Sequence, residues 1–136
     1  MSILLFVLVL FVLILVHEWG HFIVAKKTGM RVDEFGIGFP PKLFGVQKGE
    51  TEYTLNAIPI GGFVRIFGEN SQDAQEASDY ERSFVARPKW AQALVLVAGV
   101  AMNILFAWFL FLIVNVVGVP TMVEEATAGP AAQLYV

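Results

Sequence analysis

The chain has 136 residues, 57% of them hydrophobic, and its nine basic and twelve acidic residues give a net charge of −3. No basic patch interleaved with aromatic residues indicates a nucleic-acid partner. Because the chain has no cysteine, it has neither a disulfide framework nor a thiolate metal site, and any metal ligand must be His, Asp or Glu. A soluble domain has about half of its residues apolar, and the excess here lies in two uncharged blocks.

The first block, residues 3–16, carries no polar side chain and predicts a first membrane-spanning helix within residues 1–25. A spanning helix needs about 20 apolar residues, so this helix must continue through residues 17–25. A signal peptide is the competing interpretation. It would need a basic segment before the block and small residues after it, but Met1 and Ser2 precede the block and His17 follows it.

Residues 26–89 predict a segment on the cytoplasmic side with membrane-associated β-hairpins. Glycines and prolines divide it into strand-like runs at residues 32–37, 42–46, 52–57 and 62–67. In the last run, Phe63 and Arg65 fall on one face and Val64 and Ile66 on the other. We expect a small, twisted, largely antiparallel sheet that partly dips toward the membrane. The polar residues 70–82 predict a mobile loop or a short surface helix.

The second block, residues 90–119, is uncharged and predicts a second membrane-spanning helix. All nine lysines and arginines lie between the two blocks. Since short loops rich in Lys and Arg stay in the cytoplasm, the N-terminus and the tail, residues 120–136, should be extracytoplasmic. The fold class expected is a mainly α membrane protein, with two transmembrane helices joined by a cytoplasmic-side, partly re-entrant β-hairpin region.

The stretch His17-Glu18-Trp19-Gly20-His21 carries the chemistry. Residues i and i+4 of a helix lie one turn apart on the same face, so two imidazoles at this spacing can bind one Zn²⁺. Glu18 lies beside them, where it can act as a general base toward the attacking water. Ionisable residues inside a membrane span are functional candidates by default. The alternative is a helix end at the interface, where the three side chains simply face water.

A third zinc ligand is missing from this pattern, although catalytic zinc takes three protein ligands and a water. Five acidic residues lie in the polar middle segment rather than in a span: Asp33, Asp73, Asp79, Glu34 and Glu69. The sequence therefore supplies two clear ligands.

Three ordered segments resemble the site-2 protease family, and most closely its bacterial, sigma-E-regulating (RseP-type) branch. They are VHEWGHFIVAKKTGMRVDEFGIGFPPKLF, TEYTLNAIPIGGFVRIFGE and RSFVARPKWAQALVLVAGVAMNILFA. The resemblance implies that His17 and His21 bind zinc and that Glu18 is the general base. It also implies a third ligand, an Asp in a later helix beyond a PDZ region, and it makes the tail after Pro120 the start of that region.

The resemblance further implies a membrane re-entrant β-hairpin over about residues 52–67 that presents an edge strand to an unwound substrate, a form of β-augmentation. Gly61, Gly62 and Phe63 would lie in this substrate-binding hairpin. The family's Gly-Pro-x-x-Asn signature here begins at Gly99, with Val100 in place of Pro. Asn103 would contact the substrate or support the site, whereas without the family it could equally be a packing residue between helices.

Three hypotheses follow. The first is an intramembrane protease of the bacterial inner membrane that cuts single-pass membrane proteins, such as anti-sigma factors or remnant signal peptides, in regulated intramembrane proteolysis. The second is a truncated, catalytically incomplete fragment that lacks the third ligand. The third is a metal-binding membrane scaffold or transporter component, which should show more ionisable residues inside its spans.

Overall fold

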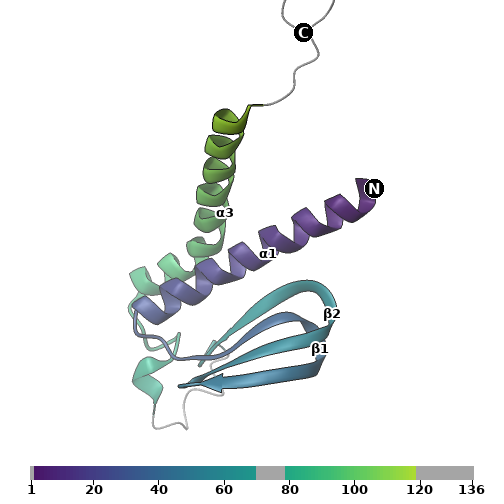
Figure 1. Ribbon diagram of the computed structural model, residues 1–136. Coiled ribbons are helices and arrows are strands. Elements are labelled where there is room, and N and C mark those ends of the chain that lie inside the picture. The colour runs from purple at the N-terminus through teal and green to yellow at the C-terminus, as the bar shows by residue number, and fades with distance from the viewer. Residues whose placement is uncertain (1, 70–78, 119–136) are drawn as a thin grey trace, which may run out of the picture. The chain divides into compact units, whose positions relative to one another are not determined.

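A computed structural model describes residues 2–69 and 79–118 (Figure 1). The elements in chain order are helix α1 (Ser2–Lys27), strand β1 (Val32–Lys48), strand β2 (Thr51–Ile66), the short 3₁₀ helix η1 (Tyr80–Arg82) and helix α3 (Lys89–Val117). The two long helices lie where the apolar blocks predict them, with the sheet between them in the sequence. Most of the polar stretch at 70–82, and the tail 120–136, lie outside the described residues.

Both long helices have the length and composition needed to cross a membrane, with mean hydropathies of 2.6 for α1 and 2.4 for α3. Large apolar side chains point outward from both; Ile3 is 81% exposed and Leu96 65%. Water-soluble proteins rarely leave apolar surface of this extent uncovered. The two helices therefore fit a membrane protein.

Local signals set the ends of the helices. After α1, Gly29 has a φ of +76°, its N–H bonds to the carbonyl of Lys26, and the N–H of Met30 bonds to the carbonyl of Ala25. This is the Schellman arrangement, which satisfies the last carbonyls of a helix. At the end of α3, Gly118 has a φ of +82°, and its N–H bonds to the carbonyl of Val114.

The sheet consists of β1 and β2, which pair antiparallel across a turn at Gly49 and Glu50. Each strand is long and bent, so each strand contributes two segments to the sheet. The second half of β1 pairs with the first half of β2, from Lys48↔Thr51 to Lys42↔Asn56. The first half of β1 lies between the two halves of β2, with Ile37 opposite both Leu55 and Gly62. The segment 62–66 therefore has a strand partner on one side only among the described residues.

This arrangement changes two expectations. The four predicted runs merge into two strands, because Gly38 (φ +79°) and Gly61 (φ +94°) bend the chain and do not end it. The hairpin expected over residues 52–67 is not formed by that stretch alone. Both of its halves belong to β2 and pair with β1 rather than with each other. The bend expected at Gly61 and Gly62 is present.

The core lies where the end of α1, the sheet and the start of α3 meet. Ala25 and Met30 are fully buried, as is Val32, and Ile66, Ala91 and Val95 complete the buried cluster. Val64 packs against this cluster. Val64 and Ile66 therefore share the inner face of the strand, as their alternation predicts.

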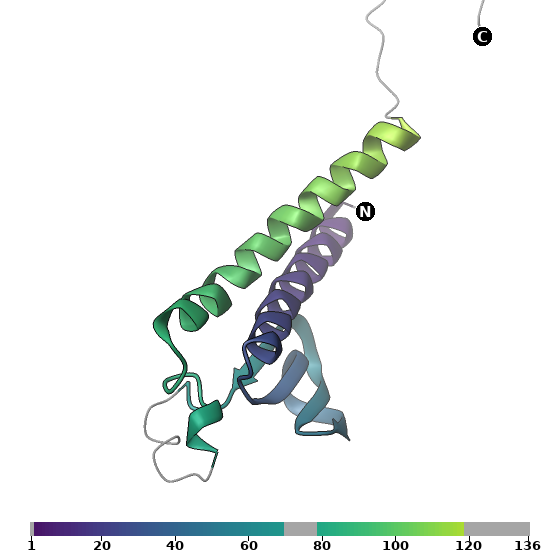
Figure 2. The same cartoon turned by 90° about the vertical axis from the view of Figure 1, so that its left-hand side faces the viewer.

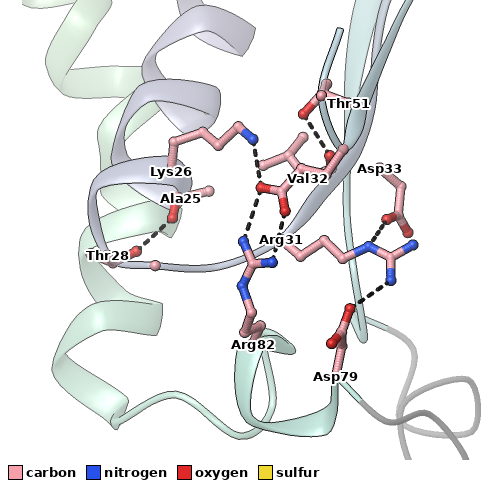
Figure 3. A network of polar contacts seen from close by, with 12 residues as sticks. Ala25, Lys26, Thr28, Arg31, Val32, Asp33, Thr51, Asp79 and Arg82 are labelled. Atoms are coloured by element: carbon pink, nitrogen blue, oxygen red, sulfur yellow. Dashed lines mark hydrogen bonds and ion pairs between the residues drawn. The ribbon is translucent and has the colours of Figure 1, made fainter. Parts of the chain in front are cut away.

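An ion-pair network ties the end of α1 to the β1–β2 turn and to η1 (Figure 3). Glu50 accepts hydrogen bonds from Lys26 at 2.7 Å and from Arg82 at 2.9 Å. These bonds from Arg82 and Lys26 lower the pKa of the Glu50 carboxyl from 4.5 to about 2, and the bond to Glu50 raises the pKa of Arg82. In the same region Arg31 pairs with Asp33 at 2.7 Å and with Asp79 at 3.1 Å.

Candidate metal centre

Helix α1 brings the two histidines together as their spacing predicts. The ring centroids of His17 and His21 are 4.7 Å apart, and the rings meet edge to face at 75°. The C-terminal half of α1, which carries them, crosses α3 (Figures 1 and 2). The contacts of both rings with α3 decide what the pair can bind.

A backbone carbonyl of α3 fixes the tautomer of His21. Its Nδ1 lies 2.7 Å from the carbonyl oxygen of Val95. Because a carbonyl can only accept, Nδ1 must carry the proton and donate it. The lone pair of the neutral ring is then on Nε2, which is the arrangement found at metal-binding histidines whose other nitrogen is held by a carbonyl.

The Nε2 atoms of both histidines pack against Gly99 of α3. A methyl group placed on the Gly99 Cα would lie 2.5 Å from Nε2 of His17 and 2.5 Å from Nε2 of His21. Both imidazole nitrogens therefore lie at the same residue of α3 and close to each other. Two neutral imidazoles on one helix face are donors that zinc accepts, so the residues present fit two ligands of a zinc site.

A second glycine allows the helices to come this close. A Cβ at Gly20 would lie 2.5 Å from the backbone oxygen of Ala98 and 2.9 Å from Cβ of Met102. Gly20, which lies between the two histidines in the sequence, is buried. The missing side chain at this crossing is what lets α3 reach the imidazoles.

An open cleft of about 390 Å³ lies beside the histidine pair, lined by Leu10, Leu13, Ile14, His17, Glu18 and Asn103. Glu18 is only partly buried. Its carboxylate therefore shares one cavity with a ring that could hold the metal. That is the position needed by a base acting on water in the cleft.

No group of three or more His, Cys, Asp or Glu side chains suited to a metal occurs in residues 2–69 and 79–118. Asp33 and Asp79 pair with Arg31, and Glu34 pairs with Arg65. Asp73 lies outside the described residues. The centre therefore provides two imidazoles and one carboxylate.

Comparison with known proteins agrees with this geometry. The model of Peptidase family M50 matches residues 5–134. The chain belongs to this family. The resemblance to the site-2 proteases predicted from the three sequence segments is thereby confirmed.

Relatives of this M50 chain include proteins named "Putative zinc metalloprotease". One from Thermotoga maritima is 38% identical over 98% of this chain and 27% of its own length. One from Clostridium perfringens is 51% identical over 74% of this chain and 28% of its own length. One from Nostoc is 43% identical over 82% of this chain and 30% of its own length. The M50 chain spans less than a third of the length of these relatives.

Of the four residues predicted to bind substrate, Asn103 lines the cleft, and Gly61 and Gly62 pack against α1 residues that line it. A Cβ at Gly62 would lie 3.7 Å from Cγ of Glu18, and one at Gly61 would lie 3.8 Å from Cγ2 of Ile14. Phe63 points to the other face, where its ring covers Gly36.

Sequence reasoning assigned no role to three groups of the M50 chain that shape the centre: the carbonyl of Val95, Gly20 and Gly99. The signals were the glycines themselves and, for Gly99, its place at the start of the family's Gly-Pro-x-x-Asn signature. A glycine inside a helix costs about 0.5–1 kcal/mol relative to alanine, so two of them in long apolar helices indicate close approach of another group.

Proposed function

We propose that this chain carries two zinc ligands and the general base of an intramembrane metalloprotease. The observation that supports this most is that both imidazole Nε2 atoms pack against the same residue, Gly99, with Glu18 in the adjoining cleft. His17 and His21 would hold zinc, and a third ligand would come from outside the described residues. The family's later Asp helix, beyond a PDZ region, is the proposed source.

Bound zinc would supply an activated water and polarise the scissile carbonyl. The Glu18 carboxylate would accept the proton of the attacking water and return it to the leaving amine. The Val95 carbonyl would keep the proton of His21 on Nδ1. Of these groups, Glu18 lines the open cleft.

The edge of β2 that has no strand partner among the described residues is the proposed substrate-binding element. Residues 62–66 pair with β1 on one side, and Gly62 lies beside Leu15 and Glu18 of α1. An extended substrate that adds a strand here would use backbone hydrogen bonds for affinity. It would also hold its peptide bonds near the base. A helical segment must unwind to bind in this way, because its own hydrogen bonds occupy the backbone groups.

The proposed substrates are single-pass membrane proteins, such as anti-sigma factors or remnant signal peptides, cut in regulated intramembrane proteolysis. The proposed location is the bacterial inner membrane, with α1 and α3 crossing the bilayer. Because every lysine and arginine lies between the two spans, the N-terminus and the tail would be extracytoplasmic.

Cleavage of a membrane-anchored reporter by the complete protein that contains this chain tests the proposal. The variant Glu18→Gln keeps the size of the side chain and removes the base, and we expect a loss of at least about 10²-fold in cleavage. Glu81→Gln in η1 is the matched control, since it makes the same chemical change outside the cleft. Equal cleavage by both variants would remove Glu18 from the mechanism.

The presence of only two imidazole ligands in the described residues favours a second candidate. The 136-residue chain alone would be a weak zinc binder without protease activity. Zinc content of the purified chain after mild chelation tests this candidate. Loss of the zinc supports the incomplete centre, whereas stoichiometric zinc would overturn it and show that the third ligand is within the chain.

A further inference from the structure

The environment of His17 differs from that of His21 at one decisive atom. Nδ1 of His21 faces a carbonyl, but Nδ1 of His17 faces the side-chain amide of Asn103, with Nδ2 at 3.5 Å. The Oδ1 atom of the same amide is buried and has no hydrogen-bond partner within the described part of the chain. The amide therefore presents its donor group to the ring.

That orientation conflicts with metal binding. If the NH₂ group of Asn103 donates to Nδ1 of His17, the neutral ring must carry its own proton on Nε2. Nε2 of His17 is one of the two imidazole nitrogens that pack against Gly99, and it would be the ligand atom in the proposed centre. A protonated Nε2 has no lone pair for a metal, so the pair would offer one ligand instead of two.

Turning the amide by 180° removes the conflict, because Oδ1 then occupies the position of Nδ2. The nitrogen and oxygen of an amide have nearly the same shape, and their hydrogen-bond partners decide the orientation. The turn places the NH₂ group in the space that Oδ1 held. The turn therefore benefits the metal-binding nitrogen of His17 and not the hydrogen bonding of the amide itself.

We infer that Asn103 is a positioning residue that accepts the Nδ1–H of His17 through Oδ1 and so keeps the Nε2 lone pair available for zinc. The inference rests on the proposed metal centre and deepens it. Asn103 and the Val95 carbonyl then each accept the Nδ1–H of one histidine. On α3 they lie four residues after and four residues before Gly99. Outer contacts of this kind fix the tautomer of metal-binding histidines.

The tautomers can be read directly by ¹⁵N NMR of the chain in detergent micelles, labelled at histidine and free of metal after chelation. The chain has only two histidines, and a His21→Gln variant assigns their signals. We expect both rings to carry the proton on Nδ1. A His17 ring protonated on Nε2 would overturn the inference.

Two substitutions separate the acceptor from the volume of the side chain. Asn103→Leu has no acceptor, so His17 should shift toward the Nε2–H form that free histidine prefers, while His21 stays unchanged as an internal control. Asn103→Asp keeps an acceptor and should keep the Nδ1–H form. Asn103→Ala serves in place of Leu if that variant does not fold.

Zinc affinity, measured by competition with a chromophoric chelator, is the second readout. We expect Asn103→Leu to weaken zinc binding about 10–100-fold, as the loss of such outer contacts does, and Asn103→Asp to bind at least as tightly as the parent chain. Unchanged tautomer and affinity in Asn103→Leu would overturn the inference. If the parent chain shows the expected tautomers but the complete protein binds no zinc, the proposed function fails and the positioning role stands.

Discussion

Gly99→Ala tests the geometry of the centre with a single methyl group. The added carbon would lie 2.5 Å from both Nε2 atoms and 2.6 Å from Cε1 of His17. Favourable contacts between non-bonded heavy atoms are about 3.5–4.0 Å, so the rings must retreat by roughly 1 Å. Functional geometry tolerates only about 0.5 Å of displacement.

The expected result is a loss of zinc binding without a loss of fold. Displacing both ligands should weaken zinc binding by at least about 10–100-fold, the range seen when even an outer contact of a ligand is lost. Alanine in place of a helical glycine favours the helix by about 0.5–1 kcal/mol, so helicity measured by circular dichroism should be kept.

The assay is zinc competition with a chromophoric chelator in detergent, with Val100→Ala as the control. Val100 is the next residue on α3 and is 54% exposed, so its truncation should leave zinc affinity unchanged. Zinc affinity of Gly99→Ala within about twofold of the parent chain would show that the two nitrogens do not share one ligand position.

Two further predictions concern the packing around the centre. Gly20→Val should push α1 away from Ala98, because the added Cβ would lie 2.5 Å from the backbone oxygen of Ala98. We expect a destabilisation of about 1–3 kcal/mol, typical of overpacking, measured by thermal unfolding in detergent, and a melting curve equal to the parent's would contradict this. Glu50 has a folded pKa of about 2, below its ordinary value of 4.5, so its contribution is complete above pH 4.5 and is lost as the pH falls toward 2. The variant Glu50→Gln should therefore be less stable than the parent chain at pH 7, by about 0.2–1 kcal/mol for each partly exposed ion pair. The free energies of unfolding of the two should converge near pH 2. A difference that stays constant across this range would exclude the ion pairs as the cause.

Patterns that depend on neighbouring residues in the chain predicted the structure well. The apolar blocks predict α1 and α3 because helix length and hydrophobicity are local properties. The four-residue spacing of His17 and His21 places their rings side by side because the helix repeat is fixed. The alternation of Val64 and Ile66 likewise predicts which side of β2 is buried.

Contacts between elements could not be predicted in the same way. The Val95 carbonyl and Gly99 meet the histidines only because α1 and α3 cross at Gly20, and no spacing within either helix specifies that crossing. In the sheet, Gly38 and Gly61 have the same sequence signal whether they end a strand or bend it. Only the pairing of β1 with both halves of β2 shows that they bend it.

Zinc K-edge X-ray absorption on the complete, zinc-loaded protein tests the central claim most directly. Two imidazole nitrogens from this chain should bind the metal at about 2.0–2.1 Å, and His17→Ala should remove one of them. A zinc spectrum that keeps the same number of imidazoles in His17→Ala and His21→Ala would place the metal elsewhere.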